Sequence, residues 1–180
     1  MLRLFVGIRF NETVGFMLRG LCAGLPGAKW VNPDGFHLTL RFIGDIDGRM
    51  ADDLDTNLSM IQSPAFDLQL SSVGQFGQFE KAHTVWAGVT RNDALYHLRD
   101  KVESAAVRAG IEPEHRRFSP HVTLGKLHRT PPDWLETYLV QNTGFKSPVF
   151  TVTEFCLFSS HSGDGGRIYL PEASYPLQVT

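Results

Sequence analysis

Residues 36–40 read Phe-His-Leu-Thr-Leu, and residues 120–124 read Pro-His-Val-Thr-Leu. Both stretches contain His-x-Thr-Leu, a pattern that amino-acid composition alone would produce about 0.05 times in a chain of this length. The two copies lie at equivalent places in the first and second halves of the 180 residues. They therefore predict an internal duplication, and the fold is expected to follow from it.

Apolar periodicity and turn-forming residues around the two copies predict alternating strands and helices. Strands are expected at 2–10, 36–43, 66–73, 83–89, 120–127, 149–158 and 167–170, and helices at 11–23, 47–60, 92–109 and 132–140. Loops rich in glycine, proline or polar residues are expected at 24–35, 74–81 and 159–166. Each half runs strand, helix, strand, helix, strand, and the second half begins near His83.

Length and composition favour a single folded unit. The chain is 42% hydrophobic and 20% charged, as is ordinary for a globular protein, and 180 residues can bury a core without a metal or a disulfide. No linker separates the halves, so residues 1–180 are predicted to form one domain of two pseudo-symmetric lobes that share a core. The net charge of −2 excludes a strongly basic coat for non-specific nucleic-acid binding but permits a local basic groove.

Other classes of protein are disfavoured by specific absences in the sequence. No stretch approaches the ~18 apolar residues of a transmembrane helix, and the first ten residues do not follow a signal-peptide pattern. Cys22 and Cys156 form no C-x-x-C pair, so neither a zinc site nor a disulfide framework is indicated. We expect a cytoplasmic monomer with no cofactor and no membrane partner.

The period of a β-strand places both polar motif side chains on one face. His37 and Thr39 would lie about 7 Å apart along the strand, whereas the leucines that alternate with them would point into the core. The second copy places His121 and Thr123 in the same way. If a pseudo-two-fold axis relates the halves, two imidazoles and two hydroxyls converge on one cleft.

This set of groups fits the chemistry of a phosphate ester. Two hydroxyls can donate to non-bridging phosphate oxygens, and two imidazoles on opposite sides can serve as base and acid in an in-line displacement. Histidine has an ordinary pKa of about 6.5, so a neutral and a protonated copy can coexist near neutral pH. The sequence contains no His-x-His, no HExxH and no carboxylate set typical of a metal centre, which indicates metal-independent phosphoester chemistry.

The paired motifs resemble those of the two-histidine (2H) phosphoesterases. Within them, the sequence is similar to the RNA 2′,3′-cyclic phosphodiesterases, historically called 2′-5′ RNA ligases. The similarity covers nearly the whole chain, in RLFVGIRF (3–10), WVNPDGFHLTLRFIGD (30–45), VWAGV (85–89), RRFSPHVTLGKL (116–127) and CLFSSHSGDGGRIYL (156–170).

The resemblance implies an α+β, bilobal fold in which two antiparallel sheets line a central cleft, with helices on the outside. It implies hydrolysis of 2′,3′-cyclic phosphates, on RNA ends or nucleotides, to 2′-phosphates. By the same resemblance His37 is the proton donor and His121 the proton acceptor.

One departure from the family pattern concerns the phosphate-binding cation. The family commonly continues the second motif as His-x-Thr-Leu-x-Arg, whereas this chain has Gly125-Lys126. Lysine keeps the charge but lacks the planar, bidentate fork of arginine. Arg41 lies four residues after His37, so a regular strand would place it on the catalytic face, where it could compensate.

Three further residues are candidates for substrate binding. Arg117 flanks the second motif and could contact phosphate or the RNA backbone, although a solvated charge is the simpler interpretation. Phe76 lies in a Gly/Gln-rich stretch and could stack on a nucleobase. Tyr169 could hydrogen-bond a phosphate or a ribose, and for both aromatic residues core packing is the alternative. Residues 162–166, SGDGG, lack the ending of a phosphate-binding P-loop.

Other functions remain open at this point. The same chemistry could act on ADP-ribose cyclic phosphate or on 2′-5′ linked oligonucleotides, and ligation is possible as the reverse reaction. A non-catalytic module that binds RNA ends is an alternative of a different class. Two complete His-x-Thr pairs argue against it, because binding alone does not require two titratable groups.

Overall fold

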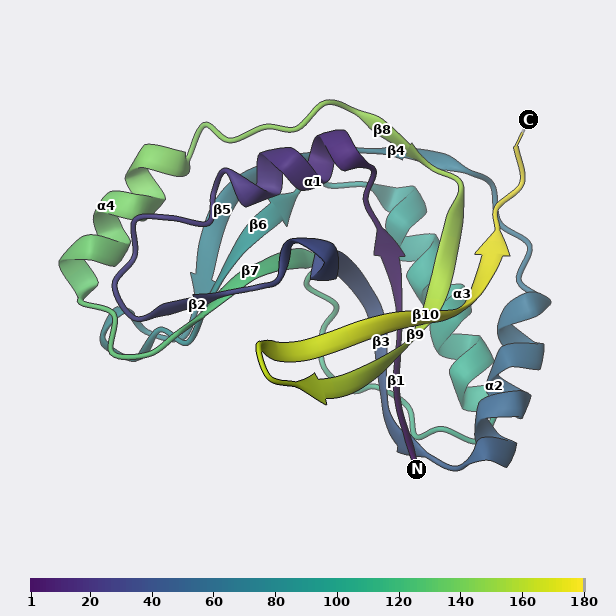
Figure 1. The fold of residues 1–180 in the computed structure, drawn as a ribbon. Coiled ribbons are helices and arrows are strands. Elements are labelled where there is room, and N and C mark those ends of the chain that lie inside the picture. Colours follow the sequence, from purple (N-terminus) through teal and green to yellow (C-terminus); the bar gives the residue numbers. More distant parts are fainter. Residues whose placement is uncertain (180) are drawn as a thin grey trace.

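The computed structural model describes residues 1–179 and is dominated by two four-stranded antiparallel sheets (Figure 1). The first sheet has the order β10-β9-β1-β3 and contains β1 (Leu2–Arg9), β3 (His37–Ile46), β9 (Glu154–Gly163) and β10 (Gly166–Pro176). The second has the order β2-β7-β6-β5 and contains β2 (Ala28–Trp30), β5 (Leu70–Phe76), β6 (Thr84–Val89) and β7 (His121–Leu127). A short pair joins β4 (Phe66–Leu68) to β8 (Phe150–Val152).

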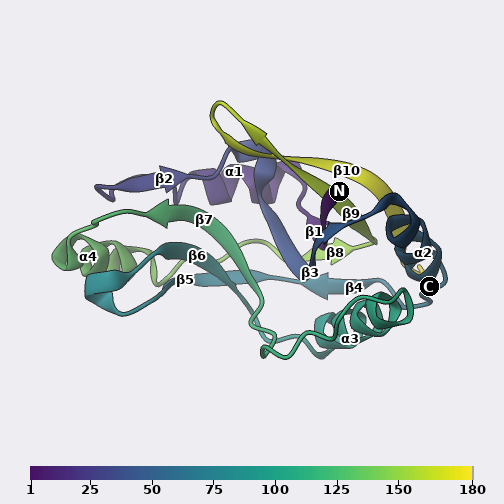
Figure 2. The same ribbon diagram turned by 90° about the horizontal axis from the view of Figure 1, so that it is seen from below.

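The helices lie around the outside of the strands (Figures 1 and 2). They are α1 (Glu12–Arg19), α2 (Gly48–Ser59), α3 (Asp93–Arg108) and α4 (Pro132–Asn142), with short 3-10 turns η1 (Pro33–Gly35) and η2 (Phe79–Lys81). Asn11, Asp47 and Asn92 begin the first three, and each side chain accepts a hydrogen bond from the backbone N–H three residues later, as N-caps do. The expected α+β class with two antiparallel sheets is confirmed.

The duplication is interleaved rather than sequential. In the first half β1 pairs with β3, and in the second half β6 pairs with β7. A strand of each half joins the sheet of the other half, because β9 pairs with β1 and β5 pairs with β6. The β4–β8 pair also joins the two halves. The boundary near His83 therefore divides the sequence repeat but does not divide the two sheets.

One buried apolar cluster contains side chains from both sheets and from all four helices. It includes Val6 and Leu38 of the first sheet together with Val85, Val122 and Leu124 of the second. Each such side chain contributes about 1.5–3 kcal/mol by leaving water. The strands that carry the two motifs are thus fixed from behind by the same core.

Several element boundaries differ from those expected from the sequence. Helix α1 ends at Arg19, not near residue 23, because Gly20 follows it and glycine is a poor helix former. The expected loop at 24–35 contains β2 and η1, and β5 extends to Phe76 in the expected loop at 74–81.

The largest difference lies at residues 159–166, which form most of a hairpin instead of a loop. Strands β9 and β10 pair up to Gly163 and Gly166, and Gly166 adopts a φ of 121° that favours glycine. Ser160 and Ser162 hold the polar strand together because both hydroxyls accept hydrogen bonds from Arg167. From this turn to residue 179 the structure contains no helix, which agrees with the rejection of a P-loop.

Candidate active site

Both motif strands carry a β-bulge at the same position. In β3, Thr39 pairs with Gly7 and Arg41 with Val6, so Leu40 is an extra residue. In β7, Thr123 pairs with Trp86 and Gly125 with Val85, so Leu124 is the equivalent extra residue. A bulge reverses the in–out alternation that follows it. The side chains before each bulge therefore keep the expected faces, and those after it do not.

The two histidines are held in the same way. The Nδ1 atom of His37 lies 2.8 Å from the carbonyl oxygen of Gly35, and that of His121 lies 2.8 Å from the carbonyl oxygen of Ser119. A carbonyl oxygen can only accept, so Nδ1 carries the proton in both rings. This bond fixes each ring and leaves Nε2 free to take up or release a proton.

Two of the four motif side chains, those of His37 and Thr123, line a pocket of about 470 Å³, whereas Thr39 and His121 are not among its lining residues. His37 of β3 and Thr123 of β7 both line it, together with Lys126 and Tyr169. The two strands are in contact, and the charge on His121 influences the pKa of His37. Thr39 is half-buried on the same strand face as His37, as the strand period predicts.

Aromatic rings enclose each imidazole. The His37 ring centre lies 4.5 Å from that of Phe5 and 4.9 Å from that of Tyr169. The His121 ring centre lies 4.8 Å from Phe76, edge to face, and 6.3 Å from Trp86. These walls restrict water around both rings.

Burial is the main cause that lowers the pKa of both histidines. For His37 the bond to Gly35 opposes this effect, and the charge of His121 lowers the pKa further. For His121 the bond to Ser119 opposes it, and the charge of Lys126 lowers the pKa further. Both rings are therefore predominantly neutral at pH 7 in the free protein, because an unperturbed histidine titrates near 6.5.

Comparison with known proteins places the chain in a family. A model of the 2′-5′ RNA ligase superfamily matches residues 24–164. The chain belongs to this superfamily. It is 31% identical to the RNA 2′,3′-cyclic phosphodiesterase of Escherichia coli, over 83% of this chain and 77% of that protein. With the protein of that name from Thermotoga maritima, the identity is 27% over 93% and 91% of the two chains.

The match to the Aeropyrum pernix protein of the same name is 35% identical but spans 58% of this chain and 59% of that one. Among solved structures, Escherichia coli LigT complexed with 3′-AMP has a TM-score of 0.80 at 27% identity, over 98% of both chains. A phosphoesterase crystal structure matches with a TM-score of 0.80 at 26% identity, again over 98% of both chains. The family resemblance predicted from the two motifs is confirmed.

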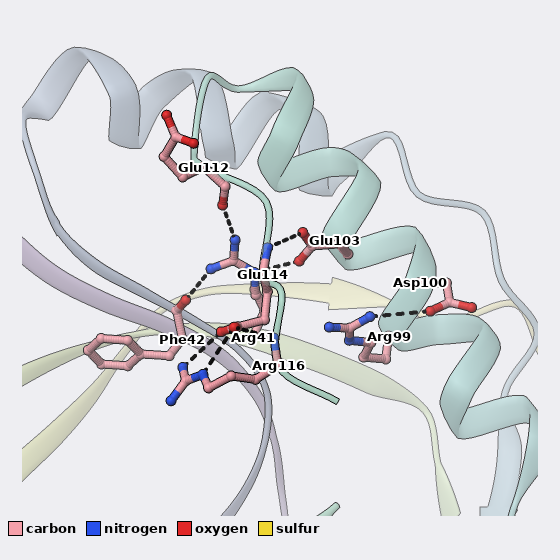
Figure 3. A network of polar contacts seen from close by, with 8 residues as sticks. All are labelled: Arg41, Phe42, Arg99, Asp100, Glu103, Glu112, Glu114 and Arg116. Carbon is pink, nitrogen blue, oxygen red and sulfur yellow. Dashed lines mark hydrogen bonds and ion pairs between the residues drawn. The ribbon is translucent and has the colours of Figure 1, made fainter. Parts of the chain in front are cut away.

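The expectation that Arg41 faces the catalytic cleft is wrong. The bulge at Leu40 turns its side chain to the opposite face, where it is 6% exposed. Figure 3 shows its guanidinium paired with the Glu103 carboxylate and donating to the backbone oxygens of Phe42 and Glu112. All of its nitrogens are engaged, so Arg41 links β3 to α3 and to the segment that precedes the second motif.

Lys126, by contrast, follows the equivalent bulge on the cleft side. It lines the same pocket as His37 and Thr123, and its Nζ donates to Thr84 Oγ1 at 3.2 Å. Thr84 is its cross-strand neighbour and is 2% exposed. The ammonium group is thus anchored beside His121 by a buried hydroxyl and keeps donors for a ligand.

The other predicted residues take different positions. Phe76 is the last residue of β5 and packs against His121, and Tyr169 of β10 lines the pocket beside His37. Burial raises the pKa of Tyr169, so its phenol remains a hydrogen-bond donor at neutral pH. Arg117 is exposed, four residues before His121, and does not line the pocket.

Sequence reasoning missed several residues that form the pocket. Lys29, Trp30 and Arg167 all line it, and they come from segments expected to be a loop or a short strand. Trp86 was also missed, although it lies in the quoted stretch VWAGV. Gly74 leaves room for its ring, because a Cβ there would lie 2.3 Å from it. The adjacent basic and aromatic residues Lys29 and Trp30 were the sequence feature that could have indicated a binding surface here.

Two further features concern residues 1–179. Within these residues, no three His, Cys, Asp or Glu side chains lie close enough together to hold a metal ion. In the same part of the chain, no helix has the length and apolarity needed to cross a bilayer.

Proposed function

We propose that the chain hydrolyses RNA 2′,3′-cyclic phosphates to 2′-phosphates by metal-independent acid–base catalysis, with His121 as the base and His37 as the acid. The observation that carries the proposal is the matched pair of imidazoles, each held by an Nδ1–H bond to a carbonyl two residues earlier. Relatives named RNA 2′,3′-cyclic phosphodiesterase support the same reaction.

The reaction begins with proton removal from water. Neutral His121 accepts the proton at Nε2 while the water oxygen forms a bond to phosphorus. The bond from phosphorus to the 3′ oxygen breaks on the opposite side, and His37 donates its Nε2 proton to that oxygen. The products are a 2′-phosphate and a free 3′ hydroxyl, and a proton exchange with solvent restores both histidines.

The surroundings of each histidine support this division. Low pKa favours the neutral base form of His121, and both burial and Lys126 act in that direction. His37 must be protonated to act as the acid, although burial lowers its pKa. A bound phosphate anion raises that pKa through its charge, so the substrate itself would produce the required protonation state.

The remaining groups would hold the phosphate and the ribose. Thr39 and Thr123 would donate to non-bridging oxygens, and Lys126 would neutralise charge that develops in the transition state. Tyr169, whose phenol stays protonated, would donate to phosphate or ribose, and Phe76 would orient the nucleoside. We assign no substrate contact to Arg117, which is exposed and does not line the pocket.

We further propose that the whole chain acts as one domain and as a monomer in the cytoplasm. The interleaved strands support a single domain, because neither sheet can form from one half alone.

Turnover of 2′,3′-cyclic AMP after exhaustive chelation tests the proposal. We expect full activity in the presence of chelator and no stimulation by added divalent ions. Binding of the nucleotide without turnover would instead identify a non-catalytic binding module. Loss of activity that a single metal restores would show that the chemistry depends on metal.

A further inference from the structure

A second hollow adjoins the catalytic pocket and has no role in the reaction described above. It has a volume of about 440 Å³ and is lined by residues that include Arg19, Trp30, Asn32 and Phe36. It shares Trp30, Val31, Asn32 and Gly165 with the catalytic pocket, so the two spaces are neighbours. We call it the upstream hollow.

Elements from distant parts of the sequence form this hollow. In Figure 1, β2 and η1 lie between α1 and the end of the β9–β10 hairpin. Arg19 comes from the last turn of α1, and Gly165 from the turn of the hairpin. Trp30 is held firmly, because Gly125 has no side chain and a Cβ there would lie 2.8 Å from the indole ring.

The charged side chains that line these two hollows are all basic. The catalytic pocket is lined by Lys29, Lys126 and Arg167, and the upstream hollow by Arg19. Among the residues of 1–179 that line either space, none is an aspartate or a glutamate. The local basic groove that the overall charge of −2 permits therefore exists at this place.

Arg19 is well suited to bind an anion. Its side chain is exposed, and within the described residues it makes no hydrogen bond or ion pair, unlike Arg167, which donates to two serine hydroxyls and a carbonyl. An exposed, unpaired guanidinium offers its full fork of donors to phosphate.

A third hollow continues beyond Arg19 and has a different character. It has a volume of about 730 Å³ and shares Arg19, Pro33 and Phe36 with the upstream hollow. Glu12 and Asp34 also line it, and its second arginine, Arg9, is already paired with Glu154. Carboxylates repel a phosphate backbone, so the favourable path for a polyanion ends near Arg19.

We propose that the upstream hollow binds the nucleotide that precedes the reacting 3′ end of an RNA, with its phosphodiester on Arg19 and its base against Trp30. Base stacking on an aromatic ring is tolerant of sequence, and arginine is a common phosphate ligand. This proposal rests on the proposed function and names its substrate class, which is an oligonucleotide end rather than a free cyclic mononucleotide.

The test compares kcat/KM for 2′,3′-cyclic AMP with kcat/KM for dinucleotide and tetranucleotide substrates that end in the same cyclic group. We expect the dinucleotide to be favoured about tenfold over the mononucleotide, as one charged hydrogen bond allows. The further gain from dinucleotide to tetranucleotide should be smaller. Arg19→Gln should remove the dinucleotide advantage and leave the mononucleotide rate unchanged within about twofold.

Matched variants and salt dependence make the result specific. Arg91→Gln removes an exposed arginine, with 92% of its side chain accessible, that lines neither space, and should change none of the rates. Arg19→Lys should restore part of the dinucleotide advantage. The slope of log kcat/KM against log salt for the dinucleotide should become shallower by about 0.7 in Arg19→Gln, as for one lost phosphate contact to a single strand.

Two results would overturn the inference while the proposed function stands. One is a wild-type protein that cleaves the mononucleotide and the dinucleotide equally well, and the other is an Arg19→Gln variant that affects both substrates alike or neither. A wild-type protein that cleaves none of the substrates would overturn the proposed function and this inference together.

Discussion

The two motif strands have the same backbone arrangement, with a bulge at the same position, but they differ in the side chains that follow the bulge. In β3 the bulge is followed by Arg41 and Phe42, and in β7 by Gly125 and Lys126. Arg41 turns inward and joins β3 to α3, whereas Lys126 stays in the catalytic pocket. The first motif strand thus pairs its cation within the protein, and under the proposed mechanism the second would keep its cation for the substrate.

The same asymmetry extends to the histidines. His37 is packed among Phe5, Phe158 and Tyr169, whereas His121 has an ammonium group nearby as well as aromatic neighbours. The two strands carry the same imidazole in the same setting, and under the proposed mechanism their different neighbours would give each imidazole a separate role.

The largest expected effect comes from removing either imidazole. His37→Ala and His121→Ala should each lower turnover of a 2′,3′-cyclic nucleotide by about 10²–10⁴-fold, the usual range for a lost general acid or base. The thermal unfolding temperature should change little, because both side chains are only partly buried. Near-normal turnover in either variant would contradict the two-histidine mechanism.

The next effect separates the two cations. Arg41→Met should lower the free energy of unfolding by about 3 kcal/mol, because Glu103, whose side chain is 17% exposed, loses its guanidinium partner and keeps the hydrogen bond from the Glu114 backbone N–H. Lys126→Met, at an exposed position, should change it by less than about 0.5 kcal/mol. Urea unfolding of the two variants measures both. Equal destabilisation would remove the contrast between the two strands.

A smaller effect concerns the pH dependence of kcat/KM. Since burial lowers the pKa of both histidines, the bell-shaped profile should have its maximum at or below about pH 6.5. Lys126→Met removes a positive charge that lowers the pKa of His121. That pKa should rise, and the acidic limb should move to higher pH.

The control for this shift is Lys126→Arg, which keeps the charge and should leave the acidic limb in place. Turnover should fall about tenfold in Lys126→Met, as expected for one charge-assisted hydrogen bond. An acidic limb that does not move in Lys126→Met would mean that the lysine does not act on His121.

The sequence alone predicts those parts of the site that depend on local periodicity. Alternation within a strand was sufficient to place His37 with Thr39 and His121 with Thr123, because these residues precede the bulges. Arg41 could not be placed, since the extra residue at Leu40 is defined by its pairing with β1. The pairing of β5 and β9 with strands from the other half of the chain is also defined by contacts between distant residues, so the sequence pattern did not predict it.

Polar strands and short strands were the other elements that the sequence pattern did not predict correctly. Residues 159–166 have a loop-like composition, yet Arg167 and the neighbouring serines satisfy one another across the hairpin. Strand β2 has three residues and no recognisable period. As a result, the sequence did not predict that strand β2 and the β9–β10 hairpin line the pocket beside His37.

The position of the phosphate in the product tests the division of roles between the two motifs most directly. A 2′,3′-cyclic dinucleotide is hydrolysed in the presence of chelator, and the product is followed by ³¹P nuclear magnetic resonance. With His37 protonating the 3′ oxygen, the account predicts a 2′-phosphate as the predominant product. A predominant 3′-phosphate would contradict the assignment of acid to His37 and base to His121.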